Sequence, residues 1–186
     1  MPYAVSQGFT PRMRVAFGPA LPVGTAGERE YYDLLLKEYV PAAQVRASLT
    51  AVTAEDLAPV ACGYVSAREP SLAAALTIAT YELSVEGGIP PEELQDSLRA
   101  LITAGTISVE HKGKQKVYDL AAALPKEPQV TSDEDRTLVV LTVRMGEHGS
   151  LRPEALMRAA LGRDVRVAVT RTDLMIEDEG VWRRPL

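Results

Sequence analysis

Short segments in which apolar and polar residues alternate, each ended by glycine or proline, constrain the fold of this 186-residue chain most strongly. A period of two is typical of a half-buried strand, whereas the helical spacing of Leu94, Leu98 and Leu101 ends at Gly105. The elements expected in the second part are strand 81–85, helix 90–102, strands 107–109 and 117–120, strand 138–143, helix 153–161 and strand 165–169. We interpret this part of the chain as a ferredoxin-like unit, whose arrangement is βαββαβ.

The first part of the chain shows the same order without its opening strand and helix. Residues 13–17 and 30–36 alternate and predict two strands. Pro41 begins a predicted helix, since proline is acceptable in a first turn. Residues 60–64 alternate again, so this part is interpreted as ββαβ.

We therefore predict an α+β fold with two tandem ferredoxin-like units, the first lacking its opening strand and helix. The predicted domains are residues 1–70, a truncated unit with a Gly/Pro-rich basic loop, and residues 71–186, a complete unit. Residues 125–135 are polar and are expected to form a linker. A ββαβ unit leaves a sheet edge and one sheet face uncovered. We therefore expect that the missing elements are encoded in frame upstream of Met1 or are supplied by another chain. Without them, the chain should expose apolar surface and be prone to associate with other molecules.

Composition narrows the classes of function. Twenty-five acidic and twenty basic residues give a net charge of -5, so a role on RNA must depend on a local patch. Cys62 is the only cysteine, which excludes an internal disulfide, a four-cysteine zinc site and a three-cysteine iron–sulfur cluster in this chain. It fits a cytoplasmic location, and its alternation with Val60 and Tyr64 favours a core position over a reactive thiol. No apolar run reaches the roughly 18 residues of a membrane span, so no membrane association is expected.

The opening loop is the first candidate site. Its glycines and prolines are explained as turn residues, but five side chains also offer donors to a phosphate or RNA backbone, with no acid in residues 1–27. These candidate side chains are Ser6, Gln7, Thr10, Arg12 and Arg14. If the rings of Phe9 and Phe17 are core, truncating either costs about 3 kcal/mol.

A lysine-rich turn is the second candidate site. Lys112, Lys114 and Lys116 follow His111, and such a turn is either a solvated surface feature or a salt-sensitive contact to phosphates. The two histidines, His111 and His148, have no ligand partners at metal-binding spacing, so no metal site is expected.

Several of these motifs resemble one family. The resemblance is carried by Ser6-Gln7-Gly8-Phe9-Thr10-Pro11, Val15-Ala16-Phe17, Leu21-Pro22-Val23-Gly24, Glu30, Asp33, Lys112-Gly113-Lys114 and Gly149-Ser150-Leu151-Arg152-Pro153-Glu154. Together they resemble the radical-SAM-linked protein family, a bacterial domain of unknown function. Members are fused to, or encoded near, radical S-adenosylmethionine proteins. The resemblance implies a radical SAM protein as partner, which can carry an iron–sulfur cluster, S-adenosylmethionine and cobalamin. No cofactor is expected in this chain itself, because it has no Cys-x-x-x-Cys-x-x-Cys run.

The first functional hypothesis is an accessory, non-catalytic module that presents an RNA substrate, such as tRNA or rRNA, to a radical SAM enzyme. The alternative is an RNA-modifying or RNA-cleaving enzyme whose site lies partly in a missing N-terminal segment, and a scaffold that binds no RNA is a third possibility. Arg171-Thr172-Asp173 resembles the catalytic aspartate motif of tRNA pseudouridine synthases. The glycine and histidine that follow in those enzymes are absent, so we treat this match as coincidence.

Overall fold

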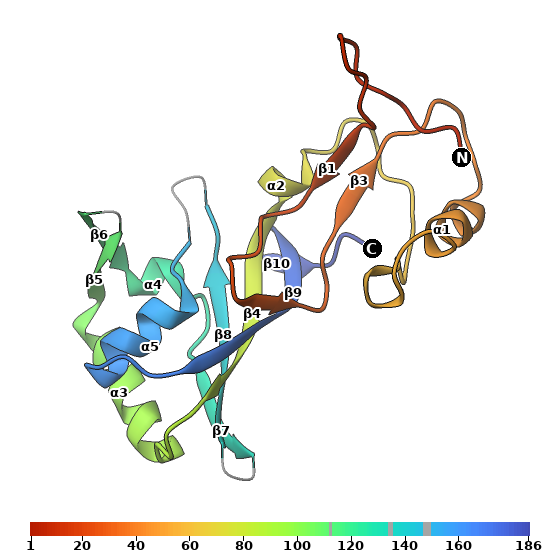
Figure 1. Ribbon diagram of the computed structural model, residues 1–186. Coiled ribbons are helices and arrows are strands. Elements are labelled where there is room, and N and C mark those ends of the chain that lie inside the picture. Colours follow the sequence, from red (N-terminus) through yellow and green to blue (C-terminus); the bar gives the residue numbers. More distant parts are fainter. Residues whose placement is uncertain (112, 134–135, 147–149) are drawn as a thin grey trace. The chain divides into compact units, whose positions relative to one another are not determined.

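The computed structural model in Figure 1 describes residues 1–111, 113–133, 136–146 and 150–186 and has a mixed α+β fold. In chain order the elements are β1 (Val15–Phe17), β2 (Thr25–Gly27), β3 (Tyr32–Leu34), α1 (Ala42–Thr50), a 3-10 turn (Glu55–Leu57), α2 (Leu72–Ala75), β4 (Leu76–Val85), α3 (Pro91–Ala104), β5 (Thr106–His111), β6 (Lys114–Asp119), α4 (Leu120–Ala123), β7 (Gln129–Asp133), β8 (Arg136–Arg144), α5 (Pro153–Leu161), β9 (Val167–Asp178) and β10 (Val181–Arg183). The predicted α+β fold class is confirmed.

The chain divides into two compact units. Unit 1 comprises Met1–Pro19, Tyr31–Ala75 and Arg184–Leu186, and unit 2 comprises Ala20–Glu30 and Leu76–Arg183. The predicted domains were continuous, whereas unit 2 takes residues 20–30 from within the first of them. Of the 22 hydrophobic side chains that are buried among the described residues, all but Val45 and Leu72 belong to unit 2. The hydrophobic core therefore lies in unit 2.

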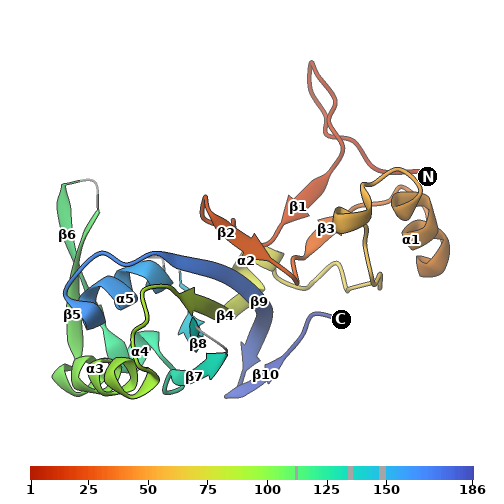
Figure 2. The same ribbon diagram turned by 60° about the horizontal axis from the view of Figure 1, so that its bottom comes forward.

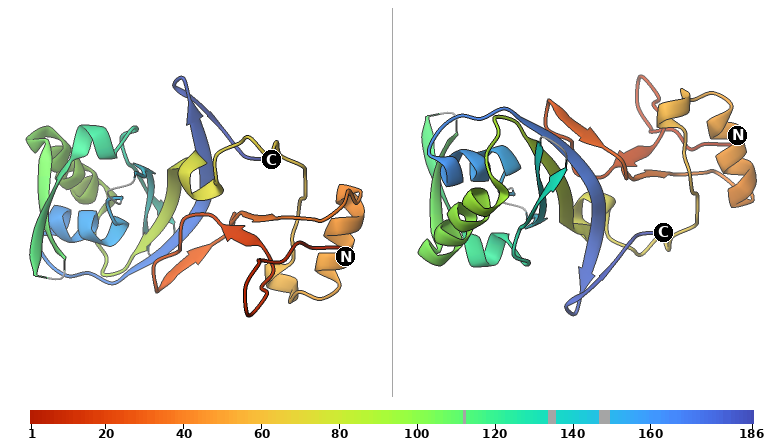
Figure 3. Two further views of the ribbon diagram at one scale, coloured as in Figure 1. Left: turned by 90° about the horizontal axis from the view of Figure 1, so that it is seen from above. Right: turned by 90° about the horizontal axis from the view of Figure 1, so that it is seen from below.

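Unit 2 is built on a sheet with the strand order β10-β9-β4-β8-β7. β4 pairs antiparallel with both β8 and β9, and β2 pairs parallel with residues 169–171 of β9 (Figure 2). α3, α4 and α5 lie on one side of this sheet (Figure 3). Leu98 of α3, Leu156 of α5 and Leu141 of β8 are fully buried and contribute to this core.

Local signals explain both long helices of unit 2. α3 has Pro91 in its first turn and ends at Gly105, whose φ of 82° places it in the left-handed region that favours glycine. α5 likewise begins at Pro153 and ends at Gly162, with φ at 63°. The helices predicted over 90–102 and 153–161 are confirmed. They could be predicted because the proline and glycine residues that start and stop them act locally.

The strands between α3 and β8 differ from the prediction. β5 and β6 form the expected hairpin, but they make a separate two-stranded sheet. β7 takes the edge of the main sheet beside β8, so the prediction that residues 125–135 form a linker was wrong. The sequence did not predict β7, because a strand at the edge of a sheet can be polar at most positions. In β7, Val130 is half-buried and the other four residues are exposed.

Unit 1 has less regular structure than predicted. β1 and β3 pair antiparallel, and isolated bridges join Tyr3 to Leu36 and Val5 to Met13. The prediction of a strand at residues 60–64 was wrong: this stretch is irregular, and Val60 is 89% exposed, so its alternation does not reflect a buried face. The ββαβ order is not found in the described part of unit 1, and the tandem ferredoxin-like arrangement is not confirmed.

The two phenylalanines are on the surface. Phe9 is 110% exposed and Phe17 is 71% exposed, so neither ring is a core residue and the loss of about 3 kcal/mol on truncation no longer applies. Both lie in the small unit, which has few helices to cover them. Cys62, also in unit 1, is half-buried.

Candidate functional site

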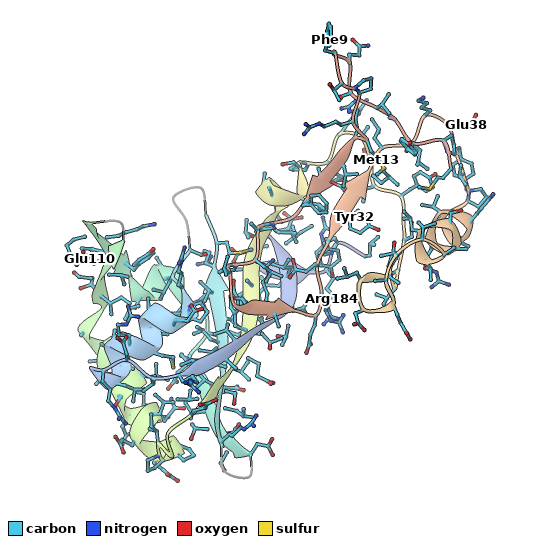
Figure 4. The ribbon with its side chains drawn as sticks, viewed as in Figure 1. Phe9, Met13, Tyr32, Glu38, Glu110 and Arg184 are labelled. Carbon is cyan, nitrogen blue, oxygen red and sulfur yellow. The ribbon has the colours of Figure 1, made fainter. Side chains whose placement is uncertain are left out.

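The opening residues fold into a hairpin with a closed tip. The backbone N–H of Ser6 donates to the carbonyl of Arg12 at 2.7 Å, and the N–H of Arg12 donates to Oγ of Ser6 at 3.0 Å. Residues 7–11, which we name the tip, connect these two positions. Gly8 has φ at 145°, a conformation that other residues rarely adopt, and this permits the turn. Figure 4 shows Phe9 at the far end of the tip.

The two arginines of the hairpin follow the tip along the returning strand. Arg12 and Arg14 are both exposed, and alternation along an extended strand places them on one face, with Met13 on the other. The N–H of Arg14 donates to Ala4 at 2.9 Å, and its carbonyl accepts from Leu35 at 3.1 Å. No ion pair between described residues includes either arginine. Both guanidinium groups are therefore available to an anion.

The structure thus brings five predicted site residues into one hairpin. Ser6, Gln7, Thr10, Arg12 and Arg14 lie in or beside the tip, and all except the half-buried Ser6 are exposed. Ser6 also has a structural function, because its side chain closes the tip.

The lysine-rich turn belongs to unit 2. Lys112 lies outside the described residues, and Lys114 begins β6. Nζ of Lys116 lies 4.7 Å from the centre of the Tyr118 ring, a cation–π contact that occupies this lysine. Contact between these lysines and RNA stays a prediction.

Aromatic residues are concentrated in unit 1, which is also much less acidic than unit 2. Seven of the ten aromatic residues lie there: Tyr3, Phe9, Phe17, Tyr31, Tyr32, Tyr39 and Tyr64. All of these except Tyr31 are exposed. Unit 1 has six basic and five acidic residues, whereas unit 2 has fourteen and twenty. The overall charge of -5 therefore divides into about +1 for unit 1 and -6 for unit 2.

Two contacts order part of this aromatic surface. The rings of Tyr39 and Tyr64 stack with centroids 5.3 Å apart, and the hydroxyl of Tyr64 donates to the carbonyl of Val40 at 2.7 Å. Phe17 and Tyr32 lie opposite each other on β1 and β3, with ring centroids 6.1 Å apart. Partial removal of the Tyr32 hydroxyl from water raises its pKa above the ordinary value of 10.0.

A buried arginine in unit 2 was missed as a structural feature by the sequence reasoning. Arg171 of β9 is 1% exposed, and its Nε and Nη2 donate to the two carboxylate oxygens of Glu30 at 2.9 and 2.5 Å. Burial lowers the pKa of Arg171, but Glu30 and Tyr81 together more than offset this, so the net shift is upward. The hydroxyl of Tyr81 interacts with the same guanidinium, and burial raises the pKa of Tyr81. Oε2 of Glu154 is buried and has no hydrogen-bond partner in the described part of the chain.

One residue of the Arg171–Glu30 contact was already singled out by the sequence. Glu30 belongs to the motifs that carry the family resemblance, and the structure shows that its carboxylate holds Arg171. Arg171 itself was considered only as part of an enzyme motif. Nothing in the sequence connects two residues that lie 141 positions apart.

The chain also matches a protein family over residues 1–153, described as "Uncharacterized protein conserved in bacteria (DUF2344)". It belongs to the DUF2344 family. The DUF2344 match includes the hairpin, the tip and Glu30, and it ends before Arg171. The family description names no activity and no partner. No curated protein and no solved structure matches the chain significantly.

Three further features bear on the function of this DUF2344 chain. An open depression of about 340 Å³ lies between α3 and α4, lined by Arg99, Ile102, Thr103, Leu120, Ala121, Leu124, Lys126 and Glu127. Its charged groups are engaged, since Arg99 pairs with Glu127 at 2.9 Å and Lys126 lies 4.4 Å from the Trp182 ring centre. Among the described residues, no group of three or more His, Cys, Asp or Glu side chains could hold a metal ion. None of the described helices is long and apolar enough to cross a membrane.

Proposed function

We propose that this chain is a non-catalytic accessory module that binds RNA through unit 1 and presents it, in the cytoplasm, to a radical SAM enzyme. One observation carries the RNA part: unit 1 combines exposed aromatic rings with two exposed arginines that have no ion pair among the described residues. Arginine and aromatic side chains are the groups that proteins use to bind phosphates and unstacked bases. The radical SAM partner is proposed from the family resemblance.

We also propose that unit 2 is a ferredoxin-like unit with an inserted hairpin. The order β9-β4-β8-β7, all antiparallel, supports this, because α3 lies between β4 and β7 in the chain and α5 between β8 and β9. In this interpretation the β5–β6 hairpin and α4 are an insertion after α3. Fold alone carries no function, so the RNA proposal depends on unit 1.

The double variant Arg12→Ala, Arg14→Ala tests the RNA contact. We expect weaker binding to cellular tRNA or rRNA and a salt slope reduced by about 1.4, since each phosphate contact to a single strand contributes about 0.7. The free energy of unfolding should stay within about 0.5 kcal/mol of the wild type, because both residues are exposed.

The matched control is Lys37→Ala, Arg68→Ala, which removes the same charge from exposed positions elsewhere in unit 1. If both double variants lose the same RNA affinity, net charge alone explains the loss. If the Arg12→Ala, Arg14→Ala variant binds RNA as tightly as the wild type, the proposed contact is refuted.

Co-purification from the native cell tests the partner. We expect a radical SAM protein to be retained with the full chain, and its absence would count against the accessory function.

Incubation of the purified chain with tRNA and rRNA, followed by mass spectrometry of nucleosides, tests the non-catalytic part. Altered nucleosides or cleavage by this chain alone would favour an enzyme instead.

A further inference from the structure

We infer that the tip binds unpaired RNA by stacking a base on the ring of Phe9. This inference rests on the proposed RNA function and specifies the form of RNA that the site takes. Phe9 is 110% exposed, and no ring contact between described residues includes it. Both faces of this ring are therefore open to a ligand, unlike the paired rings of Tyr39 and Tyr64.

The tip holds Phe9 on an ordered turn. Two hydrogen bonds between Ser6 and Arg12 close it, and the bridge between Val5 and Met13 extends the pairing below. Pro11 restricts the backbone on the other side of the ring. A base that stacks on Phe9 therefore meets a ring whose loop is already ordered, which reduces the entropy lost on binding.

The arginines lie where the backbone of such a strand would pass. Arg12 and Arg14 flank Met13, which forms a β-bridge with Val5, and an extended backbone at this bridge separates their attachment points by about 6.6 Å. Each guanidinium can therefore meet a different phosphate next to the stacked base. One exposed ring, Phe9, beside two arginines is therefore suited to a single RNA strand whose bases are unstacked.

A duplex fits this surface poorly. Bases in an A-form duplex are stacked on one another, so an aromatic ring at a loop tip cannot reach their faces. Recognition of a duplex also needs a broad positive surface along two grooves, whereas unit 1 has only one more basic than acidic residue. A protein ligand could contact Phe9 as well, but the two arginines without ion pairs among the described residues favour an anionic ligand.

Fluorescence anisotropy with the full chain tests the inference, using short labelled single-stranded RNA and a duplex of the same sequence. We expect tighter binding to the single strand and an approximately tenfold loss for Phe9→Ala, since one base stacked on an aromatic ring contributes this much. The Phe9→Trp variant should retain binding. Val23→Ala is the control, because it truncates a fully exposed apolar side chain outside unit 1. Phe9→Ala should leave the salt slope unchanged, unlike the double arginine variant.

Ultraviolet cross-linking followed by mass spectrometry gives an independent readout, with the expected RNA adduct on the peptide that contains Phe9. Unchanged single-strand binding in Phe9→Ala, or equal binding of the duplex, overturns the stacking inference and leaves the RNA function intact. If neither RNA binds the wild type, the proposed function fails as well. If Phe9→Ala loses a co-purified protein but no RNA, the tip is a protein contact and the inference is wrong.

Discussion

At the scale of single residues, the buried Arg171 forms a bidentate ion pair with the partly exposed Glu30. Arg171 is 1% exposed, and burying a guanidinium costs free energy unless its N–H groups find acceptors. The carboxylate of Glu30 accepts two hydrogen bonds from it in a bidentate arrangement. Gly27 permits this approach, because a Cβ there would lie 2.7 Å from Oε1 of Glu30. The backbone N–H of Glu28 also donates to the carbonyl of Arg171 at 3.0 Å. These contacts fasten residues 20–30 to β9.

Replacing Glu30→Ala should lower the free energy of unfolding by about 3 kcal/mol, because it leaves the charge of Arg171 buried without its partner. This is the lower end of the usual range, since the Glu30 side chain is 36% exposed and water can replace part of the contact. Urea denaturation measures the change. Glu28→Ala is the control, an exposed acid two residues away that should change stability by less than about 0.5 kcal/mol. Equal stability of the two variants would contradict the assigned importance of the pair.

At the scale of elements, a side-chain network joins β8, β9 and β10. Arg144 of β8 donates to both carboxylate oxygens of Glu177 on β9, at 3.1 and 2.6 Å. Nε1 of Trp182 on β10 donates to the same carboxylate at 3.2 Å. The hydrogen bond from Arg144 is the largest cause that holds the pKa of Glu177 below 4.5, and the bond from Trp182 adds to it. The charged form of Glu177 therefore stabilises this edge of the sheet.

The variant Glu177→Gln should be less stable than the wild type at neutral pH, and the difference should close in acid. Because folding lowers the pKa of Glu177, its contribution is present above the ordinary value of 4.5 and is lost as the pH falls through the folded value. Thermal unfolding at several pH values between neutral and below 4.5 measures this. Glu179→Gln, an exposed change in the same hairpin, should show no such closing difference. A gap between wild type and Glu177→Gln that persists in strong acid would argue against the network.

At the scale of the whole molecule, the two units differ in how much apolar surface they bury. Of the described large hydrophobic residues that are exposed, fifteen belong to unit 1 and four to unit 2: Val23, Val117, Val140 and Val181. Unit 1 buries only Val45 and Leu72 in return. A part with so small a core gains little stability from its own burial and offers apolar surface for association.

We expect the isolated chain to bind an apolar fluorescent dye and to self-associate as its concentration rises. The double variant Val52→Ser, Val60→Ser should weaken both effects with little change in stability, because these side chains are 83% and 89% exposed. Sedimentation velocity at several concentrations measures association. Val117→Ser is the control, an exposed valine of unit 2 that should have no effect. A wild-type chain that stays monomeric and binds no dye would contradict this expectation.

The sequence alone determined the elements whose signals are local. Proline at the start and glycine at the end located α3 and α5, and the apolar run of β8 indicated a central strand, as observed. The candidate residues of the opening loop were also recognised, because a donor-rich segment without acids is visible in the sequence. The exposure of Phe9 was not, since aromatic rings are usually buried and only the hairpin shows that this one projects.

Tertiary structure decided the features that depend on residues far apart in the chain. β2 has no strand pattern of its own and becomes a strand because β9, about 140 residues later, supplies the hydrogen-bond partners. Arg171 can be buried because Glu30 meets its charge, and neither residue predicts the other in sequence. Hydrogen-bond partners and desolvation depend on position in space, whereas caps, turns and periodicity depend on neighbours along the chain.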